Sequence, residues 1–186
     1  HMENSHKELV KYHSWQKHKF IECYLKIWTD NVGSKSKRGV PSLDIVDLYA
    51  ASGWAESEDA KRYNVGDEKW EGSAILAARC LEGYRFPRSL ILNSYNPDPE
   101  KQKTQFETLK GNISPFRKLR GKVVYASLPI EDAVQWALPK VDPHYPSIWI
   151  LDPYAPEQLP WHVIETIGNH RATYPKRGGL VERKPE

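Results

Sequence analysis

The stretch "LDIVDLYAASGWA" at residues 43–55 constrains the fold of this chain more than any other feature. It starts as an apolar run that contains an acid at Asp47, and it changes to small residues between Ala50 and Gly53. Such a run is typical of a buried parallel strand that ends in a tight loop. We therefore expect a strand over residues 43–48, followed by a loop of the kind that holds a nucleotide.

The rest of the chain alternates between helical and extended patterns. Apolar spacing and turn residues predict helices at 14–31, 70–84, 99–110, 129–138 and 157–170, and further strands at 89–94, 122–127 and 147–152. This alternation predicts an α/β, Rossmann-like fold, in which helices cover both faces of a mostly parallel sheet. No linker divides the chain, so we expect a single domain over residues 1–186, with 14–31 as a leading helix and 43–186 as the core.

Composition excludes some classes of protein. No apolar run approaches the roughly 18 residues that span a bilayer, so we expect no membrane segment. Cys23 and Cys80 lie in predicted helices without metal-ligand spacing, which indicates reduced core thiols in a cytoplasmic protein. The histidines show no zinc-binding pair, so no metal is expected.

The charge of the chain is mildly basic. The net charge of +3 permits a nucleic-acid partner without requiring one. Basic residues cluster at 34–39, 101–122 and 174–184. Each cluster is either a phosphate-binding surface or an ordinary solvated face.

Polar residues follow each predicted strand, at the edge where α/β sheets bind ligands. Three motifs in this order, "DLYAASG" (47–53), "EGSAILAARCL" (71–81) and "WILDPYA" (149–155), resemble the S-adenosylmethionine-dependent methyltransferase fold. More narrowly, they are similar to the three-Cys-motif partner proteins (TcmP), as are the helix "KFIECYLKIW" and the tail "GGLVERKPE". A methyltransferase sheet has more strands than the four visible here, so the resemblance implies that the sequence is an incomplete domain.

The resemblance implies a binding site for S-adenosylmethionine. Asp47, Tyr49, Ser52 and Gly53 would line its amino-acid end, with Asn93 and Ser127 as further cofactor-binding residues after the next two strands.

Two positions depart from the family pattern. Ala51 stands where a glycine is usual, which strains the loop if that position needs a positive φ angle. Asn93 stands where a carboxylate usually accepts two ribose hydrogen bonds, and a neutral amide lacks that charge-assisted contribution. Asp98 is either a substitute for the missing acid or the cap of the following helix.

The motif after the fourth strand carries the implied reaction. Asp152 would hold and polarise an amine, and Tyr154 would stack on a planar substrate. Alternatively, Asp152 caps a turn while Tyr154 packs. Trp54 likewise either covers the cofactor or fills the core.

Two functions follow from the resemblance. One is a methyltransferase that acts on a nucleic acid or a nucleotide-like amine. The other is a degenerate member that retains the fold and serves as a binding partner, for example of a three-Cys-motif protein.

Overall fold

The computed structural model describes residues 2–34, 42–56, 69–143 and 145–170. The helices are α1 (Met2–Ser34), α2 (Ser73–Gly83), α3 (Pro99–Ile113), α4 (Ile130–Ala137) and α5 (Trp161–Asn169). The strands are β1 (Leu43–Asp47), β2 (Trp54–Glu56), β3 (Lys69–Glu71), β4 (Pro87–Asn93), β5 (Val123–Ala126) and β6 (Ser147–Ile150).

Four strands form a parallel sheet in the order β5-β4-β1-β6. Strand β1 lies in the interior of the sheet and pairs with β4 on one side and β6 on the other. The predicted α/β fold with a parallel sheet is therefore confirmed.

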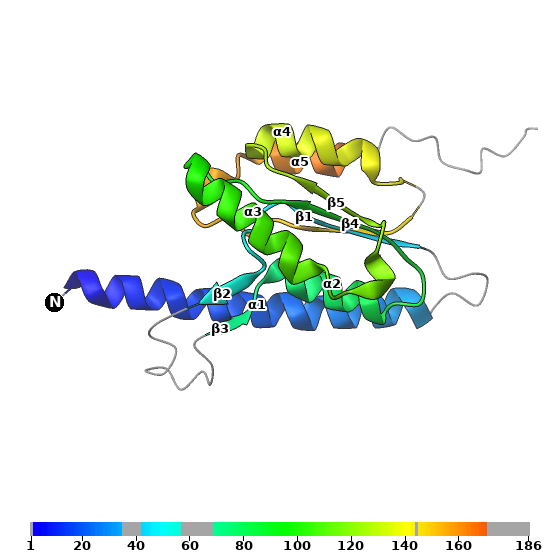
Figure 1. The fold of residues 1–186 in the computed structure, drawn as a ribbon, viewed down its shortest axis with the longest axis horizontal. Coiled ribbons are helices and arrows are strands. Elements are labelled where there is room, and N and C mark those ends of the chain that lie inside the picture. Colours follow the sequence, from blue (N-terminus) through cyan, green and yellow to red (C-terminus); the bar gives the residue numbers. More distant parts are fainter. Residues whose placement is uncertain (1, 35–41, 57–68, 144, 171–186) are drawn as a thin grey trace, which may run out of the picture.

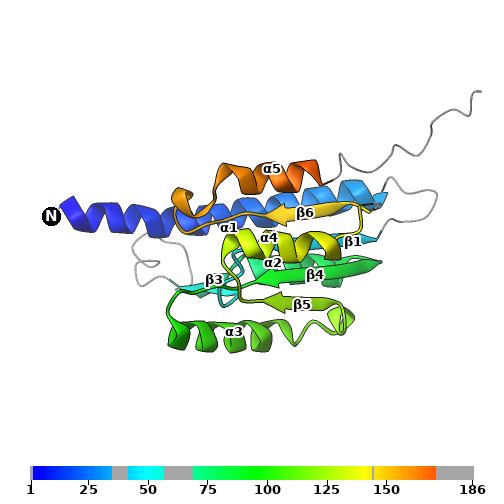
Figure 2. The same ribbon diagram turned by 90° about the horizontal axis from the view of Figure 1, so that it is seen from above.

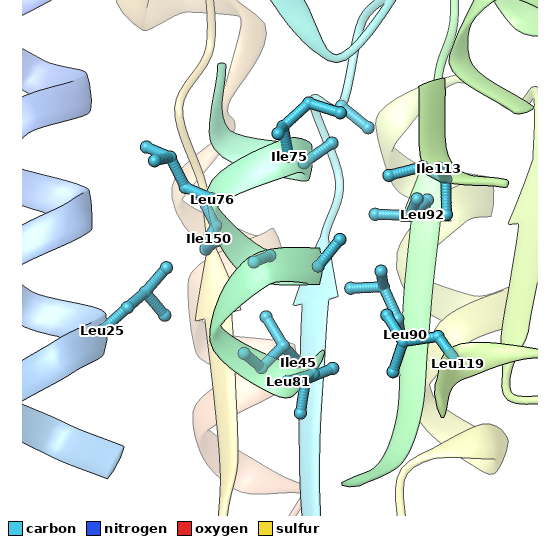
Figure 3. Close-up of a cluster of buried hydrophobic side chains, with 14 of the residues drawn as sticks. Leu25, Ile45, Ile75, Leu76, Leu81, Leu90, Leu92, Ile113, Leu119 and Ile150 are labelled. Atoms are coloured by element: carbon cyan, nitrogen blue, oxygen red, sulfur yellow. The ribbon is translucent and has the colours of Figure 1, made fainter. Parts of the chain in front are cut away.

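Helices cover both faces of this sheet (Figure 1). Helices α1, α2 and α3 lie on one face, and α4 and α5 lie on the other, as the view from above also shows (Figure 2). Figure 3 shows the core of the first face, where Leu81 of α2 lies over Ile45 of the sheet and Leu25 of α1 points toward α2 from the side. A second core lies under α4 and α5 and includes Val46, Ile91, Val134 and Val163.

The two cores explain the apolar run in β1. Every residue of β1 is buried, because successive side chains point to opposite faces and both faces are covered. Leu43 and Ile45 belong to the first core, and Val46 belongs to the second.

Three predicted helix boundaries were wrong. Helix α1 covers Met2–Ser34, whereas the sequence predicted a leading helix over 14–31. Residues 69–71 form strand β3, which pairs antiparallel with β2, so helix α2 begins at Ser73 and not at residue 70. The sequence gives no sign of this hairpin, because three-residue strands are too short to show alternation. The last predicted helix divides into a short 3₁₀ turn at Pro156–Gln158 and α5, with Pro160 at the N-cap of α5.

One prediction about the cysteines was also wrong. Cys80 is partly buried, but Cys23 is exposed on α1 and is not a core residue. Among the described residues, no helix combines the length and the apolarity needed to cross a bilayer. The predicted basic cluster at 34–39, apart from Ser34, lies outside the described residues, as do the cluster at 174–184 and the tail at 178–186.

A buried acid anchors the amino end of β1. The carboxylate of Asp44 is fully buried and accepts hydrogen bonds from Arg88, from the Ser89 hydroxyl and, at 3.3 Å, from the Asp142 amide. Both carboxylate oxygens are satisfied, so this burial joins β1, β4 and the segment before β6.

We expect Asp44→Asn to lower the free energy of unfolding by about 2 kcal/mol, because the amide loses a charge-assisted bond and offers donors where only donors face it. Urea unfolding followed by tryptophan fluorescence measures this change. The control is Glu107→Gln, which removes the exposed Lys110 pair at 3.1 Å and should cost less than about 0.5 kcal/mol. Equal costs for the two variants would contradict a structural role for Asp44.

Candidate functional site

The candidate site lies at the carboxyl edge of the sheet, between β1 and β6. The chain leaves β1 toward β4 on one side, whereas β6 pairs with β1 on the other side, so the strand order reverses here. In open α/β sheets this is the place where ligands bind. The edge is formed by the loop after β1, the start of α2 and the segment after β6.

The loop after β1 is closed by backbone hydrogen bonds. The Ala50 amide donates to the Asn93 carbonyl at 2.9 Å, and the Gly53 amide donates to the Ala50 carbonyl at 3.0 Å. Gly53 has a φ of +88°. The Gly72 amide donates to the Gly53 carbonyl at 2.9 Å, and a Cβ on Gly72 would lie 2.9 Å from that oxygen. Glycine at both positions therefore lets the loop and the start of α2 meet.

Ala51 has the positive φ angle at which an alanine is expected to strain the loop. Its φ is +46°, in the left-handed region, where the Cβ of an L-residue is crowded. The departure from glycine therefore has a cost to stability.

Asp47 is buried at the carboxyl end of β1. Its Oδ1 accepts the Tyr49 amide at 3.0 Å, whereas Oδ2 has no hydrogen-bonding partner among the described residues. Burial raises the pKa of this carboxyl to about 7; the Ser73 hydroxyl and the Tyr49 amide lower it by less, and the charge of Asp152 raises it further. A buried acid that changes its charge near neutral pH and has an unpartnered oxygen is a common feature of functional sites.

Asp152 lies near Asp47 and is held by residues of α1. Its Oδ1 accepts the Lys17 ammonium at 2.6 Å, and its Oδ2 lies 3.7 Å from Nε2 of His18. Trp70 of β3 donates its indole N–H to Nδ1 of His18 at 2.8 Å. Segments at residues 17–18, 70 and 152 thus meet at this edge.

The Trp70 bond fixes the chemistry of His18. Because Nδ1 accepts a hydrogen bond, the neutral ring carries its proton on Nε2, facing Asp152. Burial lowers the pKa of His18, and the negative charge of Asp152 opposes that shift. In this arrangement Nε2 of His18 can donate a hydrogen bond toward Asp152 but cannot accept one.

Sequence reasoning missed Lys17, His18 and Trp70. Lys17 and Asp152 are 135 positions apart, and neither belongs to a recognisable spacing. The signal that could have pointed to them is weak: two polar residues on the leading helix beside apolar neighbours.

Among the described residues, the side chains of the other predicted site residues make no hydrogen bond to this group. Tyr49 packs on the α4 and α5 side and donates its hydroxyl to the Gln158 carbonyl at 2.5 Å, and burial raises its pKa to about 12. Ser127 follows β5, at the far side of the sheet from β6. Ser52 donates its hydroxyl to the Trp54 carbonyl at 3.2 Å. Tyr154 is 86% exposed.

Asn93 is buried, and its amide is engaged by backbone groups. Both amide hydrogens are used, by the Leu48 carbonyl at 3.1 Å and the Leu128 carbonyl at 3.0 Å. Its oxygen accepts the Leu128 amide at 3.0 Å. Asn93 therefore ties the ends of β1, β4 and β5 together, and neither of its amide hydrogens is left for a ligand.

Two open alternatives have structural answers. Asp98 caps α3, since its Oδ1 accepts the amides of Glu100 at 3.1 Å and Lys101 at 3.3 Å. The backbone bond from Lys101, with further help from Glu100 and the Lys101 charge, lowers the pKa of Asp98. Trp54 packs against the first core, and Lys69 lies 5.3 Å from its ring centre.

A groove of about 570 Å³ lies elsewhere, between α1 and α2. It includes Asp30, Arg79, Cys80 and Gly83, toward the end of α2 that is remote from Ser73. It is therefore separate from the carboxyl edge. Among the described residues, no group of three or more His, Cys, Asp or Glu side chains is placed to hold a metal ion.

Comparisons with known proteins add no identification. No family model, no curated protein and no solved structure matches the chain. Function is therefore inferred from the residues at the carboxyl edge.

We expect Ala51→Gly to raise the free energy of unfolding by about 1 kcal/mol, because glycine adopts a positive φ without crowding. Urea unfolding measures the gain. The matched control is Ala155→Gly, where φ is −136° and no strain is relieved. A gain of the same size in both variants would show that Ala51 is not strained.

We expect the contribution of Asp47 to the free energy of unfolding to fall as pH rises from about 4 to 7. In this window the unfolded chain has lost the proton of Asp47 while the folded chain retains it, so deprotonation favours unfolding; above pH 7 the effect is complete. Asp47→Asn should remove this decline in urea unfolding series. Asp98→Asn should remove a dependence of the opposite sign, because the pKa of Asp98 is lowered and its contribution is lost as pH falls. An unchanged pH profile in Asp47→Asn would contradict the raised pKa.

Proposed function

We propose that this chain is a methyltransferase-like domain that binds S-adenosylmethionine at the carboxyl edge between β1 and β6. Its substrate would be a nucleic acid or a nucleotide-like amine. The observation that carries the proposal is the reversal of strand order beside Asp47 and its loop of small residues. The order of the motifs that resemble the TcmP family gives the proposal its chemistry.

The amino-acid end of the cofactor fits the residues present. Asp47 offers a buried, unpartnered Oδ2, which can accept a hydrogen bond from an ammonium group. A positive charge beside this carboxyl would lower its pKa and offset the cost of burying its ionised form. The tight loop at Ala50–Gly53 supplies backbone beside it without bulky side chains.

The ribose end fits less well. Asn93 stands where an acid would accept the ribose hydroxyls, and both of its amide hydrogens are engaged. Only an unused lone pair of its oxygen remains for a ligand. We therefore expect weaker cofactor binding than an acid at this position would give.

The bound cofactor would supply an electrophilic methyl group. Asp152 would accept a hydrogen bond from the substrate amine and orient its lone pair, once the Lys17 ammonium moves aside. The exposed ring of Tyr154 would stack on a planar substrate. His18, whose pKa is lowered by burial, would leave the charge of Asp152 only partly compensated.

A second candidate function is a binding partner without catalysis. It is favoured by the engagement of Asn93 with backbone groups and of Asp152 with Lys17. In this alternative the chain's own side chains occupy the polar groups of the edge. The partner would be a protein, and the resemblance suggests one with the three-Cys motif.

Isothermal titration with S-adenosylmethionine tests the first proposal. We expect detectable heat, and binding that tightens several-fold from pH 6 to 7.5, because the ammonium must pair with ionised Asp47. Asp47→Asn should weaken binding and remove this pH dependence, whereas the distant Glu107→Gln should change neither. No heat at millimolar cofactor would overturn the proposal. Binding in the low micromolar range, with methyl transfer lost in Asp152→Ala, would rule out the second candidate.

A further inference from the structure

Helix α1 has a second apolar face that the fold does not use. Leu25 is buried against α2, with Ile21 and Trp28 beside it. Phe20, Tyr24 and Ile27 point elsewhere and remain 76%, 59% and 55% exposed. We call these three residues the outer stripe.

The outer stripe follows the spacing of a helix contact. Its members stand at positions i, i+4 and i+7, which places them on one line along the helix. Single exposed apolar residues are ordinary, but a contiguous line of large ones on a helix face marks an interaction surface. In Figure 1, α1 lies beyond α2 on the outside of the fold, and its first turns project past the other elements.

We propose that the outer stripe docks against the outer stripe of a second copy of this chain, with the two α1 helices antiparallel. The three residues are nearly symmetric about Tyr24. In an antiparallel pair centred there, Tyr24 meets Tyr24 of the second copy, and Phe20 lies beside its Ile27. The same face then serves both subunits, as a two-fold interface requires.

The charges beside the stripe agree with this orientation. Lys19 and Asp30 lie on the same flank of the stripe, because eleven positions correspond to just over three full turns. Asp30 also lies at the groove between α1 and α2. An antiparallel pair brings these flanks together. Lys19 of each copy then lies opposite Asp30 of the other copy. A parallel pair would set identical residues at the same height and give no such match.

Lys19 can make this exchange at small cost. In the single chain it pairs with Glu22 at 3.0 Å, and both side chains are largely exposed. An exposed pair of this kind contributes little to stability.

Cys23 offers a reporter of orientation. It is exposed on the same flank, one position from the centre of the stripe. In the antiparallel pair the two Cys23 thiols lie near the two-fold axis. Mild oxidation should therefore give a disulfide-linked dimer that Cys23→Ser abolishes and Cys80→Ser retains.

Analytical ultracentrifugation of the full chain, from micromolar to hundreds of micromolar, tests the proposal. We expect a reversible dimer whose Kd rises roughly tenfold or more in Tyr24→Glu, since a charge would be buried at the centre of the contact. The matched control is Trp161→Glu, which alters an exposed aromatic residue on α5, on the opposite face of the sheet from α1, and should leave the Kd unchanged. Circular dichroism verifies that both variants fold.

Charge exchange tests the register. Lys19→Glu and Asp30→Lys should each weaken the dimer, and the double variant should restore it, because the pairs are re-formed across the axis. A monomer at every concentration, or a dimer insensitive to Tyr24→Glu, would overturn the proposal. Failure of the double variant to restore the dimer would overturn the antiparallel register.

Discussion

The pairing of β1 with β4 on one side and β6 on the other is the constraint on which the rest of the structure depends. It places an apolar strand inside the sheet, where both of its faces must be covered. Helix α2 covers β1 from one face of the sheet and helix α4 covers it from the other. The remaining helices pack beside these two. The strand pairing also creates the reversal of strand order that defines the candidate site.

The same strand buries an acid at each end, and the two acids have opposite environments. Asp44 has donors for both oxygens and joins the amino ends of the strands. Asp47 has one oxygen without a partner among the residues that the structure describes, and its pKa is about 7. The first arrangement stabilises the fold, whereas the second retains a polar group that only a further donor can satisfy. This contrast is the physical basis for placing the site at the carboxyl end.

The carboxyl edge is occupied by the chain's own side chains. Lys17 and His18 of α1 lie against Asp152. The side-chain amide of Asn93 donates its hydrogen bonds to backbone carbonyls at the ends of neighbouring strands. Any ligand here has to compete with these contacts. Catalysis and partner binding would use the same residues, but only catalysis requires Lys17 to leave Asp152.

The sequence alone determined the α/β alternation and the buried first strand, because both depend on local periodicity. It offered the cap at Asp98 only as one of two alternatives, and the structure shows the cap. It also located Asp47 and Asp152 after strands that tertiary structure then placed side by side. Only the tertiary structure decided that Ala51 has a positive φ, that Asn93 is engaged, and that Lys17, His18 and Trp70 complete the edge. These features depend on contacts between residues far apart in the chain, and no local pattern encodes which distant side chain will fill a polar position. The exposure of Cys23 and of the outer stripe was decided in the same way, since helical spacing gives α1 its faces but not which of them the core covers.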